Sequence, residues 1–175
     1  ALVLFAIGFA LTYQPHGVIT RTADVPAYTP AKGDNAPADW TAYGRDTRGL
    51  RYSPFDQINR ETVGKLDLAW TFRTGRGDVG LDQNTPLQIG DTVYSCTTQN
   101  VVIALDPDKG TEKWRFDPKA KGPFWQRCRG IGYFKLPEAS QVAGQPCNER
   151  LVLTTIDARL IEIDAKEGAL CQSFG

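Results

Sequence analysis

Val-Ile-Ala-Leu-Asp-Pro-Asp-Lys-Gly at residues 102–110 returns as Leu-Ile-Glu-Ile-Asp-Ala-Lys-Glu-Gly at residues 160–168. The two aspartates, Asp106 and Asp164, stand 58 residues apart (164 − 106). In each copy an apolar strand pattern ends in Asp-x-x-x-Gly, where Asp can cap a turn and Gly can adopt positive φ. A β-unit that recurs at tens of residues is typical of propellers and β-solenoids, in which each unit packs against its neighbours. The repeat therefore predicts an all-β protein built from stacked sheets.

Each copy of the repeat extends into a predicted four-stranded antiparallel unit. Turn signals and alternating apolar residues delimit these strands. The first unit is expected at 85–89, 92–97, 101–106 and 113–117, and the second at 130–134, 150–155, 159–164 and 169–174. A loop at 135–149 joins the first two strands of the second unit.

One further outer strand is predicted before the two units. Residues 68–73 contain Trp70-x-Phe72, which matches Trp114-x-Phe116 in the last strand of the first unit. No inner strands precede it, so we expect it to complete a blade whose other strands lie outside this sequence. A short helix with Asn59 as its N-cap is expected just upstream, reaching residue 66.

The first 38 residues are predicted to form a membrane-proximal segment. Residues 1–11 are apolar and uncharged, which suits either a signal-peptide core or the second half of a transmembrane helix. We favour the end of a transmembrane helix over residues 1–13, because no clear cleavage site follows and Tyr13 is suited to the membrane interface. Residues 14–38 contain four prolines and are predicted to form a linker, while 39–175 hold the first blades. Two repeats without closing partners suggest an N-terminal fragment of a longer chain.

Charge and cysteine content exclude some classes of function. The chain has 20 basic and 20 acidic residues, so no broad electrostatic surface for nucleic acid is expected. Four cysteines without a Cys-x-x-Cys pair argue against zinc and allow three disulfide pairings. Cys147 and Cys171 flank the later strands of the second unit and are candidates for a disulfide, although buried free thiols fit equally well.

An ordered series of short motifs resembles the pyrroloquinoline-quinone (PQQ) dehydrogenases, in particular their membrane-bound branch with glucose and quinate/shikimate dehydrogenases. The series is Asp39-Trp40-x-x-Tyr43-Gly44-Arg45, Arg51-Tyr52-Ser53-Pro54, Gln57-Ile58-Asn59, Ala69-Trp70-Thr71-Phe72-Arg73, Thr85-Pro86, Ala104-Leu105-Asp106, Cys128-Arg129-Gly130 and Asp157-Ala158-Arg159-Leu160. It covers nearly all of the chain from residue 39 onward.

This resemblance implies an eight-bladed propeller that faces the periplasm and is anchored in the bacterial inner membrane. It also implies PQQ and a divalent cation, Ca²⁺ or Mg²⁺, on the ring axis, and electron transfer to ubiquinone. The general base of the family is an Asp in a later blade. No catalytic residue and no metal ligand is therefore expected in this sequence, which should not be catalytic by itself.

Four residues are candidates for contact with PQQ. Arg129 is similar to the cofactor-contacting Arg of the family, and a guanidinium suits a carboxylate or a quinone oxygen. Gln83 precedes the first inner strand where many relatives have Glu, and Thr155 matches a Thr that hydrogen-bonds PQQ in relatives. Gln99 occupies a position that is His in glucose dehydrogenases of the membrane branch.

The expected substrate is inferred from the positions at which this sequence differs from glucose dehydrogenases of the family. Loss of the His at Gln99, together with residues 123–130, makes the chain more similar to quinate/shikimate dehydrogenases than to glucose dehydrogenases. The expected function is therefore oxidation of a cyclic polyol acid, with a membrane-bound glucose dehydrogenase as the alternative. A non-catalytic periplasmic propeller scaffold is the second alternative, and it would need neither Arg129 nor the Asp39-Trp40 motif.

Overall fold

The computed structural model describes residues 39–45, 49–53, 55–75, 82–122, 127–172 and 174. The predicted transmembrane helix at 1–13 and the linker at 14–38 lie outside these residues. Within the described ranges, no helix has the length and apolar character needed to cross a membrane.

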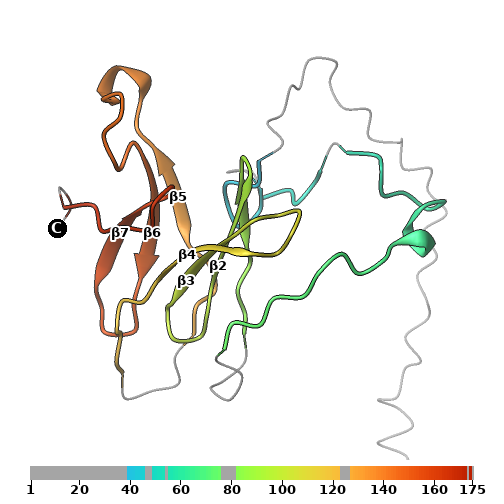
Figure 1. Cartoon of the computed structure of the whole chain (residues 1–175), viewed down its shortest axis with the longest axis horizontal. Helices are drawn as coiled ribbons and strands as arrows, with labels where there is room; N and C mark the ends of the chain where they lie inside the picture. The colour runs from blue at the N-terminus through green and yellow to red at the C-terminus, as the bar shows by residue number, and fades with distance from the viewer. Residues whose placement is uncertain are drawn as a thin grey trace, which may run out of the picture. The chain divides into compact units, whose positions relative to one another are not determined.

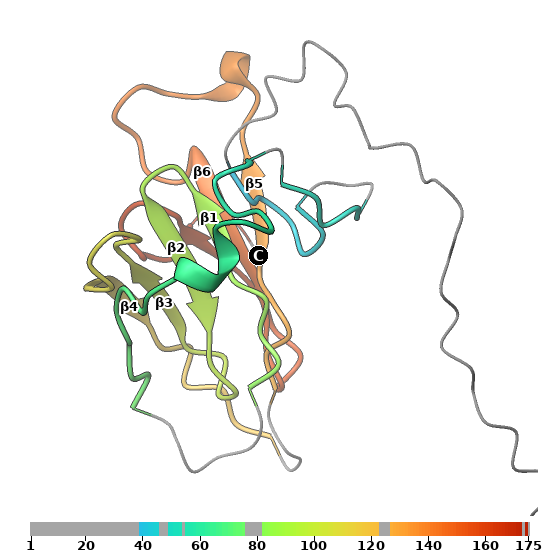
Figure 2. The same ribbon diagram turned by 90° about the vertical axis from the view of Figure 1, so that its right-hand side faces the viewer.

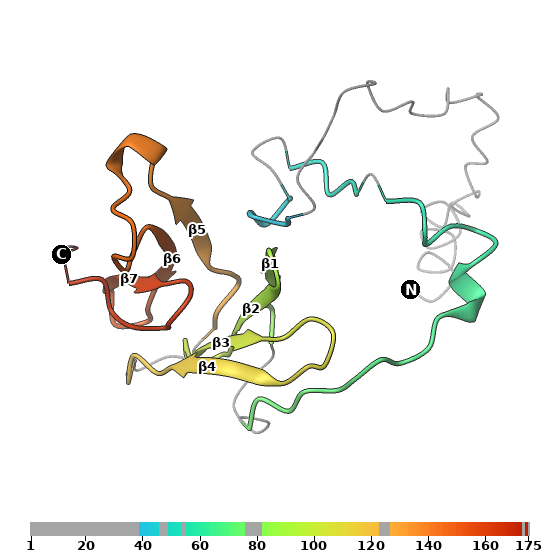
Figure 3. The ribbon, with the colours of Figure 1, turned by 45° about the horizontal axis from the view of Figure 1, so that its top comes forward.

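The described residues form two antiparallel sheets, as the repeat predicts (Figure 1). The first sheet has the strand order β1-β2-β3-β4 (Figure 2) and the second the order β5-β6-β7 (Figure 3). The strands are β1 (Leu87–Ile89), β2 (Thr92–Cys96), β3 (Val102–Leu105), β4 (Glu112–Phe116), β5 (Gly132–Lys135), β6 (Glu149–Thr154) and β7 (Leu160–Asp164). Two short 3₁₀ helices, η1 (Val63–Lys65) and η2 (Glu138–Ser140), complete the regular structure of the described residues.

The two sheets pack face to face around one hydrophobic core. Alternate residues of β2, including Tyr94 and Cys96, face this core, and Leu151 and Ile163 face it from the second sheet. Strand β3 is buried along its whole length, because its other face packs against Trp70 and Phe72. The predicted stacking of two β-units is therefore confirmed, with the first sheet lying between the second sheet and residues 68–73.

The repeated Asp-x-x-x-Gly turns have the predicted structure. Asp106 Oδ1 accepts hydrogen bonds of 2.9 Å from the amides of residues 108 and 109, and Asp164 Oδ1 accepts equivalent bonds of 2.9 and 2.8 Å. Gly110 and Gly168 have φ values of +65° and +71°. Only glycine adopts this left-handed region without strain, so both residues of the motif serve the turn itself.

A tryptophan of the preceding unit packs on each of these glycines. A Cβ atom on Gly110 would lie 2.4 Å from the Trp70 ring, and one on Gly168 would lie 2.6 Å from the Trp114 ring. The indole nitrogens donate to backbone carbonyls of the same turns, Trp70 Nε1 to Pro107 O at 2.8 Å and Trp114 Nε1 to the carbonyl of residue 165 at 3.2 Å. The repeat thus includes the junction between units, because each turn accepts the aromatic residue of its neighbour.

The first described residues cover the inner edge of the first sheet. Trp40 forms an antiparallel bridge with Gln88, with N–H···O distances of 2.7 and 3.1 Å. The side chain of Asp39 accepts a hydrogen bond of 2.9 Å from the Gly90 amide. The Asp39-Trp40 motif therefore provides hydrogen-bond partners for backbone groups along the edge of β1, which would otherwise have no neighbouring strand.

Three details differ from the predicted elements. The second sheet has three strands instead of four, because the chain pairs with β7 only around Leu170 and then turns, with the Phe174 amide donating to Cys171 O. Residues 68–73 form no strand, since no described segment supplies a backbone ladder for them. The expected helix at 59–66 shrinks to η1, although Asn59 Oδ1 does accept two turn amides at 3.0 Å. Helix η1 buries no side chain, and a short helix without packing is marginal.

Candidate functional site

The four predicted cofactor residues all lie at one end of the two sheets. Gln83 precedes β1, Gln99 lies in the β2–β3 turn, Arg129 precedes β5, and Thr155 directly follows β6. In antiparallel sheets the start of one strand and the end of the next share an edge, so these segments lie together. The Asp-x-x-x-Gly turns lie at the opposite end. We refer to the end with the four residues as the candidate end.

The segments that carry Gln83 and Arg129 are hydrogen-bonded to each other. The amide of Thr85 donates to the Arg129 carbonyl at 3.1 Å, and Asn84 Nδ2 donates to Ser95 Oγ at 2.7 Å. Both Gln83 and Arg129 have exposed side chains. Within the described part of the chain, no hydrogen bond or ion pair engages the Arg129 guanidinium, which leaves its donors for a ligand.

A disulfide fixes the segment in front of Arg129. Cys96 at the end of β2 is bonded to Cys128, with Cα atoms 5.9 Å apart, and both residues are buried. The second disulfide, Cys147–Cys171, confirms the pairing that the sequence left open as one possibility. No free cysteine remains among the described residues. The backbone next to Arg129 is therefore linked covalently to the first sheet.

The turns that hold Gln99 and Thr155 are built alike. In the first, Thr97 N donates to Val101 O at 2.9 Å and its hydroxyl accepts from the amide of residue 101 at 3.2 Å. In the second, Thr155 N donates to Arg159 O at 3.0 Å and its hydroxyl accepts from the amide of residue 159 at 3.2 Å. The 58-residue repeat thus extends to these turns (155 − 97).

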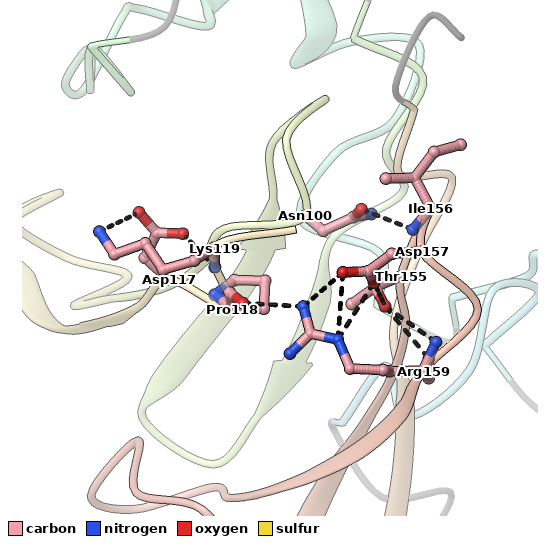
Figure 4. A network of polar contacts seen from close by, with 8 residues as sticks. All are labelled: Asn100, Asp117, Pro118, Lys119, Thr155, Ile156, Asp157 and Arg159. Atoms are coloured by element: carbon pink, nitrogen blue, oxygen red, sulfur yellow. Dashed lines mark hydrogen bonds and ion pairs between the residues drawn. The ribbon is translucent and has the colours of Figure 1, made fainter. Parts of the chain in front are cut away.

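The Thr155 hydroxyl also donates to the Asp157 carboxylate, and its side chain is buried. Arg159 pairs with the same carboxylate at 2.8 Å and donates to Pro118 O at 2.8 Å (Figure 4). These partners, Arg159 first and Thr155 second, lower the pKa of Asp157 to about 2. Thr155 is therefore engaged within its own turn, as Thr97 is, and its predicted contact with PQQ stays a prediction.

Asn100 is a residue of this end that the sequence reasoning missed. Its side chain is buried and donates from Nδ2 to Arg127 O at 3.4 Å. It also accepts a hydrogen bond from Ile156 N at 3.1 Å (Figure 4). The partners are 27 and 56 residues away, so no local pattern reveals them. The sequence signal that could have pointed to Asn100 is its position three residues after Thr97, the residue that begins the repeated turn.

Among the cavities formed by described residues are two that flank the sheets, and none of the four predicted residues lines either of them. One of about 460 Å³ lies beside β1 and is lined by Trp40, Phe55, Pro86 and neighbouring residues. The other, of about 450 Å³, lies at the end opposite to the candidate end and is lined by Tyr94, Glu149 and neighbouring residues.

The donor chemistry of the candidate end fits a flat, polyanionic quinone. Arg129 offers a cationic fork for a carboxylate, and Gln83 and Gln99 offer amide groups for quinone or carboxylate oxygens. The described residues offer no comparable set of ligands for a metal ion. Among the described residues, no group of three or more His, Cys, Asp or Glu side chains is placed to bind a metal ion.

The stacked antiparallel sheets and the Trp-on-turn junctions define a class of fold: consecutive units of a β-propeller. Residues 40–175 match the family described as PQQ, "Glucose/ethanol/alcohol dehydrogenase, beta-propeller domain". The chain belongs to this family.

Comparisons with individual proteins give the same family. The chain is 35% identical to the quinate/shikimate dehydrogenase (quinone) of Acinetobacter baylyi over 93% of its length, and 42% identical to the quinoprotein glucose dehydrogenase of Escherichia coli over 98%. Among solved structures, it resembles the quinohemoprotein alcohol dehydrogenase from Comamonas testosteroni with a TM-score of 0.62 and 28% identity over 76% of this chain and 18% of that protein. The chain spans 22% and 23% of the two curated relatives.

Proposed function

We propose that this chain forms the first blades of a PQQ-binding propeller in a membrane-anchored quinoprotein dehydrogenase. The enzyme oxidises a cyclic polyol acid, quinate or shikimate, and passes the electrons to ubiquinone. The observation that carries the proposal is the exposed Arg129 guanidinium, free of partners in the described residues, at the same end of the sheets as Gln83 and Gln99.

Each residue has a binding role in this proposal. Arg129 neutralises a carboxylate or quinone oxygen of PQQ, while Gln83 and Gln99 orient the ring through amide hydrogen bonds. When bound, PQQ would act as the two-electron oxidant of an alcohol carbon of the substrate. The divalent cation, Ca²⁺ or Mg²⁺, is bound mainly by other blades, and the general base lies in a later blade, as the family resemblance implies.

The second sheet supports the proposal of a larger propeller. Its outer face carries Phe134 and Leu160, which are 47% and 53% exposed, beside the half-buried ion pair of Arg150 and Glu162. Propellers bury both faces of a blade between neighbouring blades. We infer that a further blade covers this face in the complete enzyme.

The disulfides support a periplasmic location. Cys96–Cys128 and Cys147–Cys171 are compatible with an oxidising compartment, where structural disulfides persist. The apolar residues 1–13 are proposed to end a transmembrane helix that anchors the propeller to the bacterial inner membrane, close to its ubiquinone acceptor.

The substrate is proposed from the charge of the candidate end. Gln83 and Gln99 carry no charge, and Arg129 contributes a cation, so an anionic substrate meets less repulsion there than beside a carboxylate. Quinate and shikimate carry a carboxylate and glucose does not. Glucose is the second candidate, favoured by the 42% identity to the E. coli glucose dehydrogenase.

One experiment tests binding and substrate together. The full-length enzyme is titrated with PQQ in the presence of Ca²⁺ or Mg²⁺ and then assayed with quinate, shikimate and glucose and a quinone acceptor. We expect Arg129→Ala to weaken PQQ binding about tenfold to a hundredfold, because a charged hydrogen bond is lost. Arg115→Ala, on the outermost strand of the first sheet, is the matched control and should bind as wild type.

The substrate arm compares kcat/KM at low and high salt. Quinate should be preferred over glucose, and the preference should shrink as salt screens the cation. A preference for glucose at low salt would transfer the assignment to glucose dehydrogenase. Failure of the full-length protein to bind PQQ would instead favour a non-catalytic propeller scaffold.

A further inference from the structure

One buried side chain connects the three segments that carry Gln99, Arg129 and Thr155. Asn100 directly follows Gln99, and only 1% of its surface is exposed. Its amide donates to the carbonyl of residue 127, two residues before Arg129, and accepts from the amide of residue 156, next to Thr155. Figure 4 shows Asn100 pointing at Ile156 across the gap between the two sheets.

We propose that Asn100 is a positioning residue for the PQQ site, which holds the segments of Arg129 and Thr155 at a fixed spacing from the β2–β3 turn. The inference rests on the proposed function. A flat ligand that contacts several turns binds more tightly when those turns are already ordered in the free protein. Ordering them on binding would cost free energy and lower the affinity.

The backbone of the turn does not by itself require the Asn100 amide. Asn100 has φ of +63°, and Ala158, its equivalent in the second sheet (158 − 100 = 58), also has φ of +63°. The same turn therefore forms with a methyl side chain. What distinguishes Asn100 is its pair of hydrogen bonds to the other segments.

Other links at this end would keep the fold intact without Asn100. The Cys96–Cys128 disulfide ties the segment before Arg129 to β2, and Arg159 donates to Pro118 O at 2.8 Å. Asn100→Gly removes both amide contacts while leaving the left-handed backbone unstrained. The variant therefore tests the hydrogen bonds and not the turn.

The experiment uses the full-length enzyme and three readouts: PQQ affinity by titration of the apo form, hydrogen exchange at the Ile156 amide, and the melting temperature. For Asn100→Gly we expect about tenfold weaker PQQ binding and faster exchange at Ile156, since two hydrogen bonds are lost. Asn100→Asp keeps an acceptor for the Ile156 amide but turns a buried carboxylate oxygen toward the Arg127 carbonyl, so PQQ binding should weaken at least as much as in Asn100→Gly while the Ile156 amide stays protected from exchange.

Two controls separate positioning from general stability. Ala158→Gly changes the equivalent turn and should alter neither PQQ affinity nor exchange at Ile156. Asp106→Ala removes two turn hydrogen bonds at the opposite end, and it should lower the melting temperature without changing PQQ affinity.

The outcomes distinguish this inference from the function on which it rests. If wild type binds PQQ and Asn100→Gly binds it equally well, the positioning role is wrong. A loss of affinity in Asp106→Ala as large as in Asn100→Gly would also overturn it, because the effect would then be one of stability. If wild type binds no PQQ, the proposed function itself is contradicted.

Discussion

Gly168→Ala tests whether the junction between the two units is as tight as the structure indicates. Gly168 has φ of +71°, and an added Cβ would lie 2.6 Å from two ring carbons of Trp114. The left-handed backbone costs an alanine about 1–2 kcal/mol. Overpacking against a rigid ring adds about 1–3 kcal/mol. The free energy of unfolding should therefore fall by about 2–5 kcal/mol, measured by equilibrium urea unfolding followed by far-UV circular dichroism.

Gly144→Ala is the matched control for the backbone. Gly144 has φ of +74°, and no heavy atom lies within 4 Å of the position that an added Cβ would occupy. It should lose only the backbone share, so the two variants should differ by about 1–3 kcal/mol. In the Trp114→Ala background, Gly168→Ala should cost no more than Gly144→Ala, because the ring is absent. Equal losses for both glycines in the wild-type background would refute the tight junction.

Two further predictions concern the candidate end and the disulfides. Arg159→Gln should raise the pKa of Asp157 from about 2 toward 3.8, as measured by ¹³C NMR titration of the carboxyl. The pKa of Asp157 is lower in the folded state than in the unfolded state, so its pairing with Arg159 stabilises the fold above pH 3.8, and this stabilisation is lost as pH falls toward 2. An unchanged Asp157 titration in the variant would contradict the Arg159 contact. Peptide mapping without reductant should recover Cys96 linked to Cys128 and Cys147 linked to Cys171. Replacing Cys147 and Cys171 by Ser should cost about 3 kcal/mol of unfolding free energy, whereas any other linkage would disprove the pairing.

Local chemistry made the turns and most strands predictable. Asp106 and Gly110 serve the same five-residue turn, so their roles follow from spacing alone. Strand β2 directly follows the Gly90-Asp91 turn, a local signal that the sequence shows directly. The shared end of the four predicted residues was not inferred from the sequence, and it is a consequence of the antiparallel order of the strands in the two sheets.

Features that depend on distant partners were not predictable. Residues 68–73 have a strand-like sequence, but a strand needs a neighbouring backbone, and the described residues offer none there. The pairing of four cysteines depends on which loops meet, and spacing allowed three solutions. Asn100 reads as an ordinary turn residue until Arg127 and Ile156 are brought beside it.

The repeat is conserved between the two units more fully at the end with the Asp-x-x-x-Gly turns than at the candidate end. At the opposite end, both units use the same Asp, the same Gly and the same Trp contact, so those residues serve a structure common to the two units. At the candidate end the turns share a backbone, but the side chains differ, with Asn100 in one unit and Ala158 in the other. A ligand on the axis of a ring meets each blade at a different part of its own surface. Under the proposed function, selection for binding would vary side chains at the candidate end, as Asn100 and Ala158 differ, while the repeated Thr97 and Thr155 turns keep a common backbone.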